Sequence, residues 1–99
     1  MSEHAQVVRI SAFRPAPGRR DELVDVCRAL AELTAAADGC FGAQVCEVSE
    51  QPDDVAVVSR WRNQSALDAF TGPRTEDAVR RLDGLLSEAP ATSHYIALS

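Results

Sequence analysis

The chain has 99 residues, a formal net charge of −5 at pH 7 and no lysine, so its ten basic residues are all arginine. This balance argues against nucleic-acid binding, which requires clustered basic residues that neutralise phosphates. A hydrophobic content of 45% with 25% charged residues is typical of a globular protein, and we expect one domain over residues 1–99 with an ordered core of about 6–98.

The first predicted elements are a strand over residues 6–14 and a helix over residues 19–37. Apolar residues of the strand alternate with Arg9 and Ser11, which is the period of a β-strand. A turn with two prolines ends the strand, because proline removes a backbone donor. The helix has one continuous apolar stripe and ends at residues 38–39, where Asp-Gly suits a left-handed cap.

Two strands follow, over residues 40–49 and 55–62. The polar turn between them, at residues 51–54, is short enough to predict an antiparallel hairpin. Residues 65–68 resemble a helix capping box, with Asp in place of the usual Glu, and open a short helix that ends near Phe70.

The last predicted elements are a helix and a strand. The helix follows a break at Gly72-Pro73 and runs to about residue 88, with Pro73 suited to its first turn. Residues 92–98 form the final strand. The order βαββαβ predicts an α+β, ferredoxin-like antiparallel sheet with both long helices on one face.

The second face of this sheet has no predicted helix to cover it. We expect Val8, Ile10 and Ala12 to meet the helices, which leaves the alternate residues of the strands on the free face. A patch of this size and aromatic content is near the upper limit that a monomer exposes. We therefore predict a homodimer through this face, enclosing a part-polar cavity. The residues expected on the free face are Val7, Arg9, Ser11, Phe13, Val55, Val57, Ser59 and Trp61.

Several polar residues are candidates for ligand contacts. Arg9 lies on an otherwise apolar strand and could bind a phenolate or carboxylate, or form an ion pair with a second subunit. Ser11 and Ser59 could donate hydrogen bonds to a ligand or be tolerated strand residues. His94 and Tyr95 adjoin on the last strand and point to opposite faces, so one of them faces the predicted cavity and could act as acid or base.

The three cysteines and the N-terminus bear on the compartment. An odd number of cysteines without metal-ligand spacing favours reduced thiols and no bound metal. Cys40 and Cys46 share a face and lie ~20 Å apart along their strand, so they cannot bond to each other. No run of residues approaches the roughly 20 apolar positions of a membrane span, and residues 1–4 lack the features of a signal peptide. We expect a bacterial, cytoplasmic protein without a membrane partner.

The chain resembles the antibiotic biosynthesis monooxygenase domains of the dimeric α/β-barrel superfamily over roughly residues 7–98. The resemblance rests on the order and spacing of short motifs: Pro-Gly at 17–18, Asp-Gly-Cys-Phe-Gly at 38–42, Trp61, Ser-Ala-Leu-Asp-Ala-Phe at 65–70, and Pro73. It implies a homodimer whose sheets form a barrel, often with exchange of the last strand. It also implies, as in some members, oxygen chemistry without metal or flavin on phenolic substrates that supply the electrons.

The chain also departs from the pattern of this family. Phe70 stands where members commonly have His, which removes a group that titrates near neutral pH. The quinone-forming branch has an Asn before the Trp and a Tyr after it, and those positions here are Val57 and Leu67. The quinone-forming branch also has an Arg after the Trp, and Arg81 stands at that position here. The haem-degrading branch uses Asn, Trp and His together, so haem is not expected here.

The leading hypothesis is therefore a cofactor-independent monooxygenase that acts on an aromatic or polyketide-like small molecule in a barrel cavity. The alternatives are a polyketide cyclase or isomerase, and a non-catalytic dimer that binds a small molecule. The catalytic residues are unassigned, with Arg9, His94, Tyr95 and Arg81 as candidates. The predicted pocket residues are Trp61, Phe13, Ser11, Ser59, Val57 and Phe70.

Overall fold

Seven secondary-structure elements follow one another in the predicted order in a computed structural model, which describes residues 5–70 and 73–98. The break expected at Gly72 lies outside these residues. The elements are β1 (Val7–Phe13), α1 (Arg20–Ala35), β2 (Cys40–Val48), β3 (Gln51–Trp61), α2 (Gln64–Phe70), α3 (Pro73–Arg81) and β4 (Ala91–Ile96).

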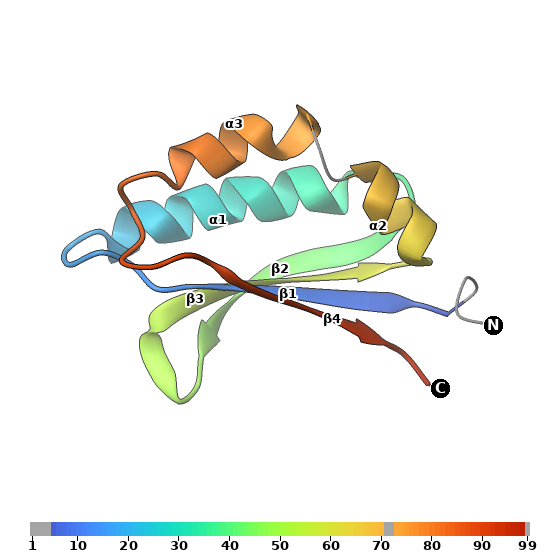
Figure 1. Cartoon of the computed structure of the whole chain (residues 1–99), viewed down its shortest axis with the longest axis horizontal. Helices are drawn as coiled ribbons and strands as arrows, with labels where there is room; N and C mark the ends of the chain where they lie inside the picture. Colours follow the sequence, from blue (N-terminus) through green and yellow to red (C-terminus); the bar gives the residue numbers. More distant parts are fainter. Residues whose placement is uncertain (1–4, 71–72, 99) are drawn as a thin grey trace.

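The four strands form one sheet in the order β2-β3-β1-β4, and each neighbouring pair is antiparallel. Helices α1 and α3 lie over one face of this sheet, while no element of the described chain covers the other face (Figure 1). The predicted ferredoxin-like α+β fold is confirmed.

The expected assignment of the two faces is wrong. Phe13, Val55 and Val57 pack against Leu23 and Cys27 of α1, so the residues expected on the free face lie beneath the helices. The open face carries the alternate set, which includes Val8, Ile10, Ala12 and Val58 on paired strands. Alternation separates two sets of residues but does not say which set meets a helix. The set with the larger apolar side chains is the buried one.

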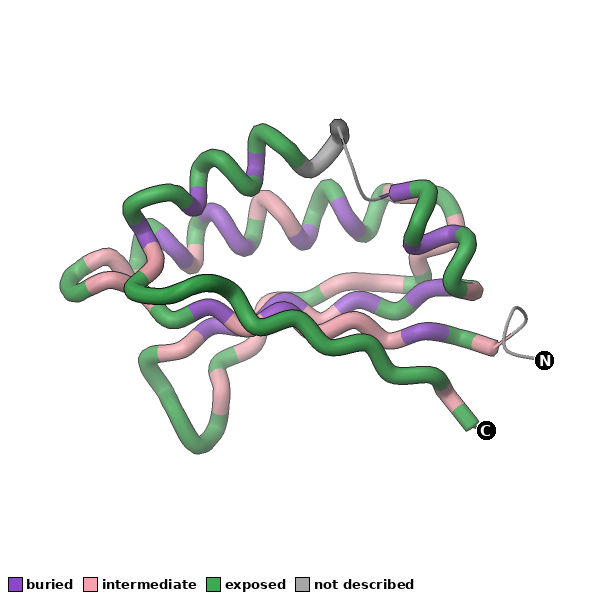
Figure 2. Tube along the Cα trace, viewed as in Figure 1, coloured by how far each residue is buried: buried purple, intermediate pink, exposed green. Residues whose placement is uncertain are grey.

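The core has two parts. The first fills the space between the sheet and the helices α1 and α3 and includes the fully buried Leu23 and Cys27. The second lies at the end of the sheet, where Trp61 and Val7 pack against Leu67 and Phe70 of α2. Figure 2 shows buried positions along β1, β3 and the helices, whereas β4 and the turn between β2 and β3 are exposed. Full burial of one such side chain contributes about 1.5–3 kcal/mol.

Helix α3 is shorter than predicted, because it ends at Arg81 rather than near residue 88. Turns follow, with Gly84 at a φ of 80°, and they carry Leu85 into the core without a helix. The amide of Ala16 donates a 2.7 Å hydrogen bond to the carbonyl of Leu85, which ties this segment to the turn after β1. The apolar spacing beyond residue 81 therefore reflects packing rather than helical periodicity.

Two turns also differ from the prediction. Strand β3 begins at Gln51, so residues 51–54 belong to the strand and the turn lies just before them. The cap of α2 is Asn63 rather than Ser65, because the Asn63 Oδ1 atom accepts a 2.9 Å hydrogen bond from the amide of Ala66. Asparagine is among the strongest N-cap residues, so the capping signal lies two positions earlier than expected.

The three cysteines are free, as predicted. Cys40 and Cys46 do not share a face, however. Cys40 lies opposite Trp61 on the helix side, whereas Cys46 lies opposite Ala56 on the open side. An irregularity in β2 between Cys40 and Gly42 inserts one residue and reverses the alternation, which explains the wrong prediction.

Candidate functional site

A cavity of about 200 Å³ lies between the sheet and the helices α1 and α3. It opens to solvent beside Pro90 and Val79, both of which are exposed. Its sheet side is formed by Arg9, Ser11, Phe13, Val57, Ser59 and Thr92. Its helix side is formed by Leu30, Thr34, Val79 and Leu82. The sheet side is therefore largely polar and the helix side largely apolar.

The strand register explains how the polar residues come together. Arg9 of β1 lies directly opposite Ser59 of β3 and, on its other side, opposite His94 of β4. Ser11 lies opposite Thr92 in the next row on the same face. Directly opposed residues of an antiparallel pair point to the same face, with Cβ atoms about 4.5–5.5 Å apart. Residues distant in the chain thus form one polar surface.

Arg9 is the charged residue of this surface. Its Nε atom is buried and has no hydrogen-bond partner among the described residues. Burial lowers the pKa of the Arg9 guanidinium, yet an arginine remains charged at neutral pH. A buried donor left without a partner costs about 1–3 kcal/mol, and more when it is charged. The cavity is therefore suited to an anionic ligand that would satisfy this donor.

Ser59 supplies a second donor. Its hydroxyl oxygen accepts a 2.8 Å hydrogen bond from the indole Nε1 of Trp61. Because a hydroxyl both donates and accepts, the proton of Ser59 remains to be donated. Within the described chain its hydroxyl has no other partner. The hydrogen bond from Trp61 therefore leaves the Ser59 hydroxyl proton free to be donated to a ligand in the cavity.

Two further hydroxyl groups complete the polar surface. The Oγ atoms of Ser11 and Thr92 lie 3.0 Å apart and share one hydrogen bond, so one proton of the pair remains free. Thr34 donates its hydroxyl to the carbonyl of Leu30 at 2.7 Å, which leaves its oxygen able to accept. The cavity can therefore hold a ligand with a negative group and a second polar substituent.

Five predicted site residues meet in this cavity, and they do so on the helix side of one chain rather than between two sheets. They are Arg9, Ser11, Phe13, Val57 and Ser59. Trp61 does not line the cavity, because it is fully buried in the second part of the core. Its ring packs against that of Phe70, with centroids 5.2 Å apart and an interplanar angle of 40°.

The other candidates lie apart from one another. His94 is exposed on the helix side at the edge of the sheet, beside Arg9. Tyr95 is 54% exposed and lies opposite Val8 on the open face. Arg81 is exposed at the end of α3. Of these three, the register brings only His94 to the same face as the cavity.

Sequence reasoning did not select Thr34 or Thr92 for the cavity. Thr34 was recognisable as a hydroxyl on the apolar stripe of its helix, where such a residue is unusual. Thr92 shares the face of His94, two positions away, but its pairing with Ser11 depends on the β1–β4 register. That register cannot be read from one strand alone.

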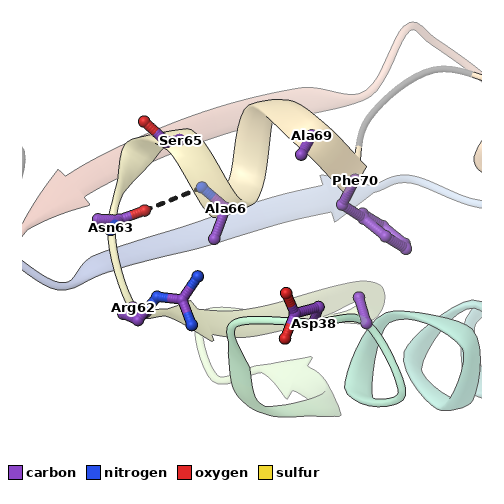
Figure 3. Close-up of a pocket in the computed structure, with 8 residues that line it drawn as sticks. Asp38, Arg62, Asn63, Ser65, Ala66, Ala69 and Phe70 are labelled. Carbon is purple, nitrogen blue, oxygen red and sulfur yellow. Dashed lines mark hydrogen bonds between the residues drawn. The ribbon is translucent and has the colours of Figure 1, made fainter.

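A second, more open groove of about 370 Å³ lies where α2 follows β3. Figure 3 shows Asp38 and Arg62 projecting into it from different segments, with the ring of Phe70 at one end. Of the predicted pocket residues it contains only Phe70. It brings together one acid and one base, which gives no net charge to select a ligand.

Residues 5–70 and 73–98 contain no group of three or more His, Cys, Asp or Glu side chains that could hold a metal ion. No helix in this part of the chain is long and apolar enough to cross a membrane.

Comparisons with solved structures agree with the fold. The chain superposes on Rv0793 from Mycobacterium tuberculosis with a TM-score of 0.83 and 25% identity, covering 95% of this chain and 96% of that one. A candidate antibiotic biosynthesis monooxygenase from Deinococcus radiodurans gives a TM-score of 0.83 at 21% identity, with 94% and 93% covered. PA3566 from Pseudomonas aeruginosa gives 0.83 at 19% identity, with 98% of each chain covered.

Comparison with protein families is more specific. No curated protein matches the chain closely enough to transfer a function. The family model described as antibiotic biosynthesis monooxygenase matches residues 6–88, which is most of the chain and includes the strands β1 and β3 that carry Arg9 and Ser59. The chain therefore belongs to the antibiotic biosynthesis monooxygenase family, and its membership supports a monooxygenase-like function of a general kind.

Proposed function

We propose that the protein is a monooxygenase that oxidises an aromatic or polyketide-like small molecule without a metal or flavin. The reaction takes place in the cavity between the sheet and the helices α1 and α3. The observation that carries this proposal is the buried Nε atom of Arg9, which has no hydrogen-bond partner among the described residues and lies on the polar side of a cavity whose other side is apolar. Such a cavity suits a flat aromatic molecule with one ionised oxygen.

The chemistry requires a substrate that supplies its own electrons. An activated CH₂ group conjugated with an aromatic ring and a carbonyl group loses a proton to give an electron-rich enolate, which reacts with O₂. Overall, CH₂ and O₂ give C=O and H₂O, so one oxygen atom enters the product and the other leaves as water. Arg9 and Ser59 stabilise the enolate oxygen by charge and hydrogen bonding, which favours its formation. Phe13 and Leu82 hold the ring in place.

The base that removes the substrate proton is proposed to be His94. It lies directly opposite Arg9 at the edge of the sheet, on the cavity side, and an imidazole nitrogen can accept a proton. Tyr95 and Arg81 are less suited to this role, because Tyr95 lies on the open face and Arg81 at the exposed end of α3.

Oxygen uptake tests the proposal. Wild-type protein is mixed with a panel of phenolic substrates of one to three rings, anthrone-type phenols among them, and O₂ consumption is compared with that of Arg9→Gln and of Arg28→Gln. Arg28 is an exposed residue of α1 outside the cavity and serves as the matched control. We expect R9Q to lose most of the rate and R28Q to retain it. Uptake equal to that of buffer across the panel would overturn the proposal.

The alternative is a cyclase or isomerase that forms the same enolate and returns the proton elsewhere. The pairing of His94 with Arg9 favours it, because proton transfer needs only a base and a group that stabilises the anion. Product formation that continues unchanged without oxygen would select this alternative. Recovery of a tightly bound ligand unaltered would instead support a binding protein, as the apolar Val57 and Leu67 suggest.

The open face supports a homodimer. Val8, Ile10 and Val58 are only partly buried there, and Tyr95 adds an exposed aromatic ring at its edge. Two copies packed through these faces would remove a contiguous apolar patch from water. We propose this arrangement as the assembly of the protein, with the free thiols suited to a reducing cytoplasm.

A further inference from the structure

We propose that the ligand of the helix-side cavity is an aromatic acid with a single ring, whose carboxylate binds Arg9 and Ser59. This inference deepens the proposed function, and it rests on that function only in taking the cavity as the ligand-binding site. It narrows the substrate class from aromatic and polyketide-like molecules to small anions.

The size of the cavity limits the ligand to one aromatic ring. Its volume is about 200 Å³. A cavity of about 150 Å³ holds benzene, and pockets for larger drug-like molecules begin near 300 Å³. One substituted ring therefore fits between Val57 on the sheet and Leu82 beside the helices. A tricyclic molecule would require the helices to move away from the sheet.

The charge of the cavity favours a ligand with a carboxylate. Among the described residues no acidic side chain lines the cavity, and Asp54 of β3 and Glu88, which precedes β4, both bind Arg14 instead. Arg9 thus has no counter-charge within the described chain. Its planar guanidinium matches the two oxygens of a carboxylate, which forms paired, charge-assisted hydrogen bonds. A neutral ester of the same shape would leave a buried donor unsatisfied.

The arrangement of the hydroxyl groups indicates where the carboxylate and a second polar substituent of the ligand bind. Ser59 lies directly opposite Arg9, and its proton is free because Trp61 already occupies its oxygen as a donor. These two groups can therefore bind the same carboxylate. The Ser11–Thr92 pair lies two residues further along β1, ~7 Å away. That spacing suits a hydroxyl substituent on the far side of one ring.

Binding of matched probes tests the inference. The probes are 4-hydroxybenzoate, its neutral methyl ester, and the three-ring acid anthracene-9-carboxylate. Binding is measured by calorimetry in oxygen-free buffer and checked by the fluorescence of Trp61, the one tryptophan of the chain. We expect 4-hydroxybenzoate to bind at least about tenfold more tightly than its ester, as loss of a charge-assisted hydrogen bond implies, and more tightly than the three-ring acid.

Variants then assign the preference to named groups. Arg9→Gln should abolish the preference for acid over ester, Arg9→Lys should retain part of it, and Ser59→Ala should weaken acid binding more than ester binding. Arg28→Gln on the exposed side of α1 should match wild type. A purely structural role of Arg9 would weaken acid and ester equally.

Three results would overturn the inference: equal binding of acid and ester, an acid preference that survives in R9Q, or no binding of any probe. The proposed function fails separately. Selective binding of 4-hydroxybenzoate without oxygen uptake by any substrate would leave the inference in place and remove the oxygenase. Oxidation of a neutral phenol by a protein with no acid preference would do the reverse.

Discussion

The indole N–H of Trp61 donates a 2.8 Å hydrogen bond to the hydroxyl of Ser59, two residues earlier on β3. Residues two apart on a strand share a face, so the bond runs along the helix side of the sheet. It links the fully buried Trp61 to a cavity residue that is 4% exposed. Because the core supplies a donor to the Ser59 oxygen, the hydroxyl proton of Ser59 remains available to a ligand.

Replacing Trp61 by Phe tests this link. Trp61→Phe removes the donor and part of the buried volume, and we expect the free energy of unfolding to fall by about 1–3 kcal/mol. Urea denaturation followed by circular dichroism measures it. The double variant with Ser59→Ala should lose less than the sum of the single losses, because the two side chains share one bond. Strict additivity would show that the bond contributes nothing.

Glycine at position 39 should be far less replaceable than glycine at position 18. Both have positive φ, 82° and 77°, which disfavours a side chain by about 1–2 kcal/mol. A Cβ on Gly39 would also lie 2.6 Å from the Cβ of Ala66, whereas one on Gly18 would meet nothing within 4 Å. In urea unfolding, G39A should lose about 1–3 kcal/mol more than G18A. Equal losses of stability in G39A and G18A would mean that α2, which carries Ala66, can move to make room for the added Cβ.

The open face should fail to dimerise when a charge is placed at its centre. Ile10→Glu would put an unpaired carboxylate into the proposed interface, which costs several kcal/mol. Leu33→Glu is the control, since Leu33 is 41% exposed on α1, away from this face. Sedimentation velocity should show a dimer for wild type and L33E and a monomer for I10E. A monomeric wild type at the same concentration would contradict the proposed assembly.

Stability should fall between about pH 9 and pH 11 because of Cys27. Burial raises the pKa of its thiol to about 11, above the value of an exposed thiol. Below pH 9 the thiol is protonated in both states, so stability is unaffected. Above pH 9 the unfolded thiol loses its proton first, which lowers the free energy of unfolding by about 1.4 kcal/mol per pH unit until the folded thiol also titrates.

Urea denaturation at a series of pH values measures this dependence. Cys27→Ala should show a slope smaller by one proton in that range, while Cys46→Ala, which changes a half-buried thiol of β2, should match wild type. Parallel curves for wild type and C27A would show that Cys27 does not titrate differently in the two states.

Much of the secondary structure was predictable, and its errors have local causes. The strand around Arg9 and the helix from about residue 20 follow from strong periodicity and clear turn residues. The helix after Pro73 was predicted too long, because Leu85 is buried from a turn and not from a helix. The cysteines of β2 were placed on one face, because an inserted residue in a strand has no clear sequence signal.

The order of the elements, the two alternating sets of strand residues and the presence of a sheet face without a helix follow from the sequence. The position of Arg9, Ser11 and Ser59 beneath the helices, rather than on the open face, follows only from the folded structure. The physical reason is that a period of two defines two faces without orienting them. Which face is covered depends on how well its side chains fill the space under a helix, and the large side chains of Phe13 and Trp61 are buried on the covered face.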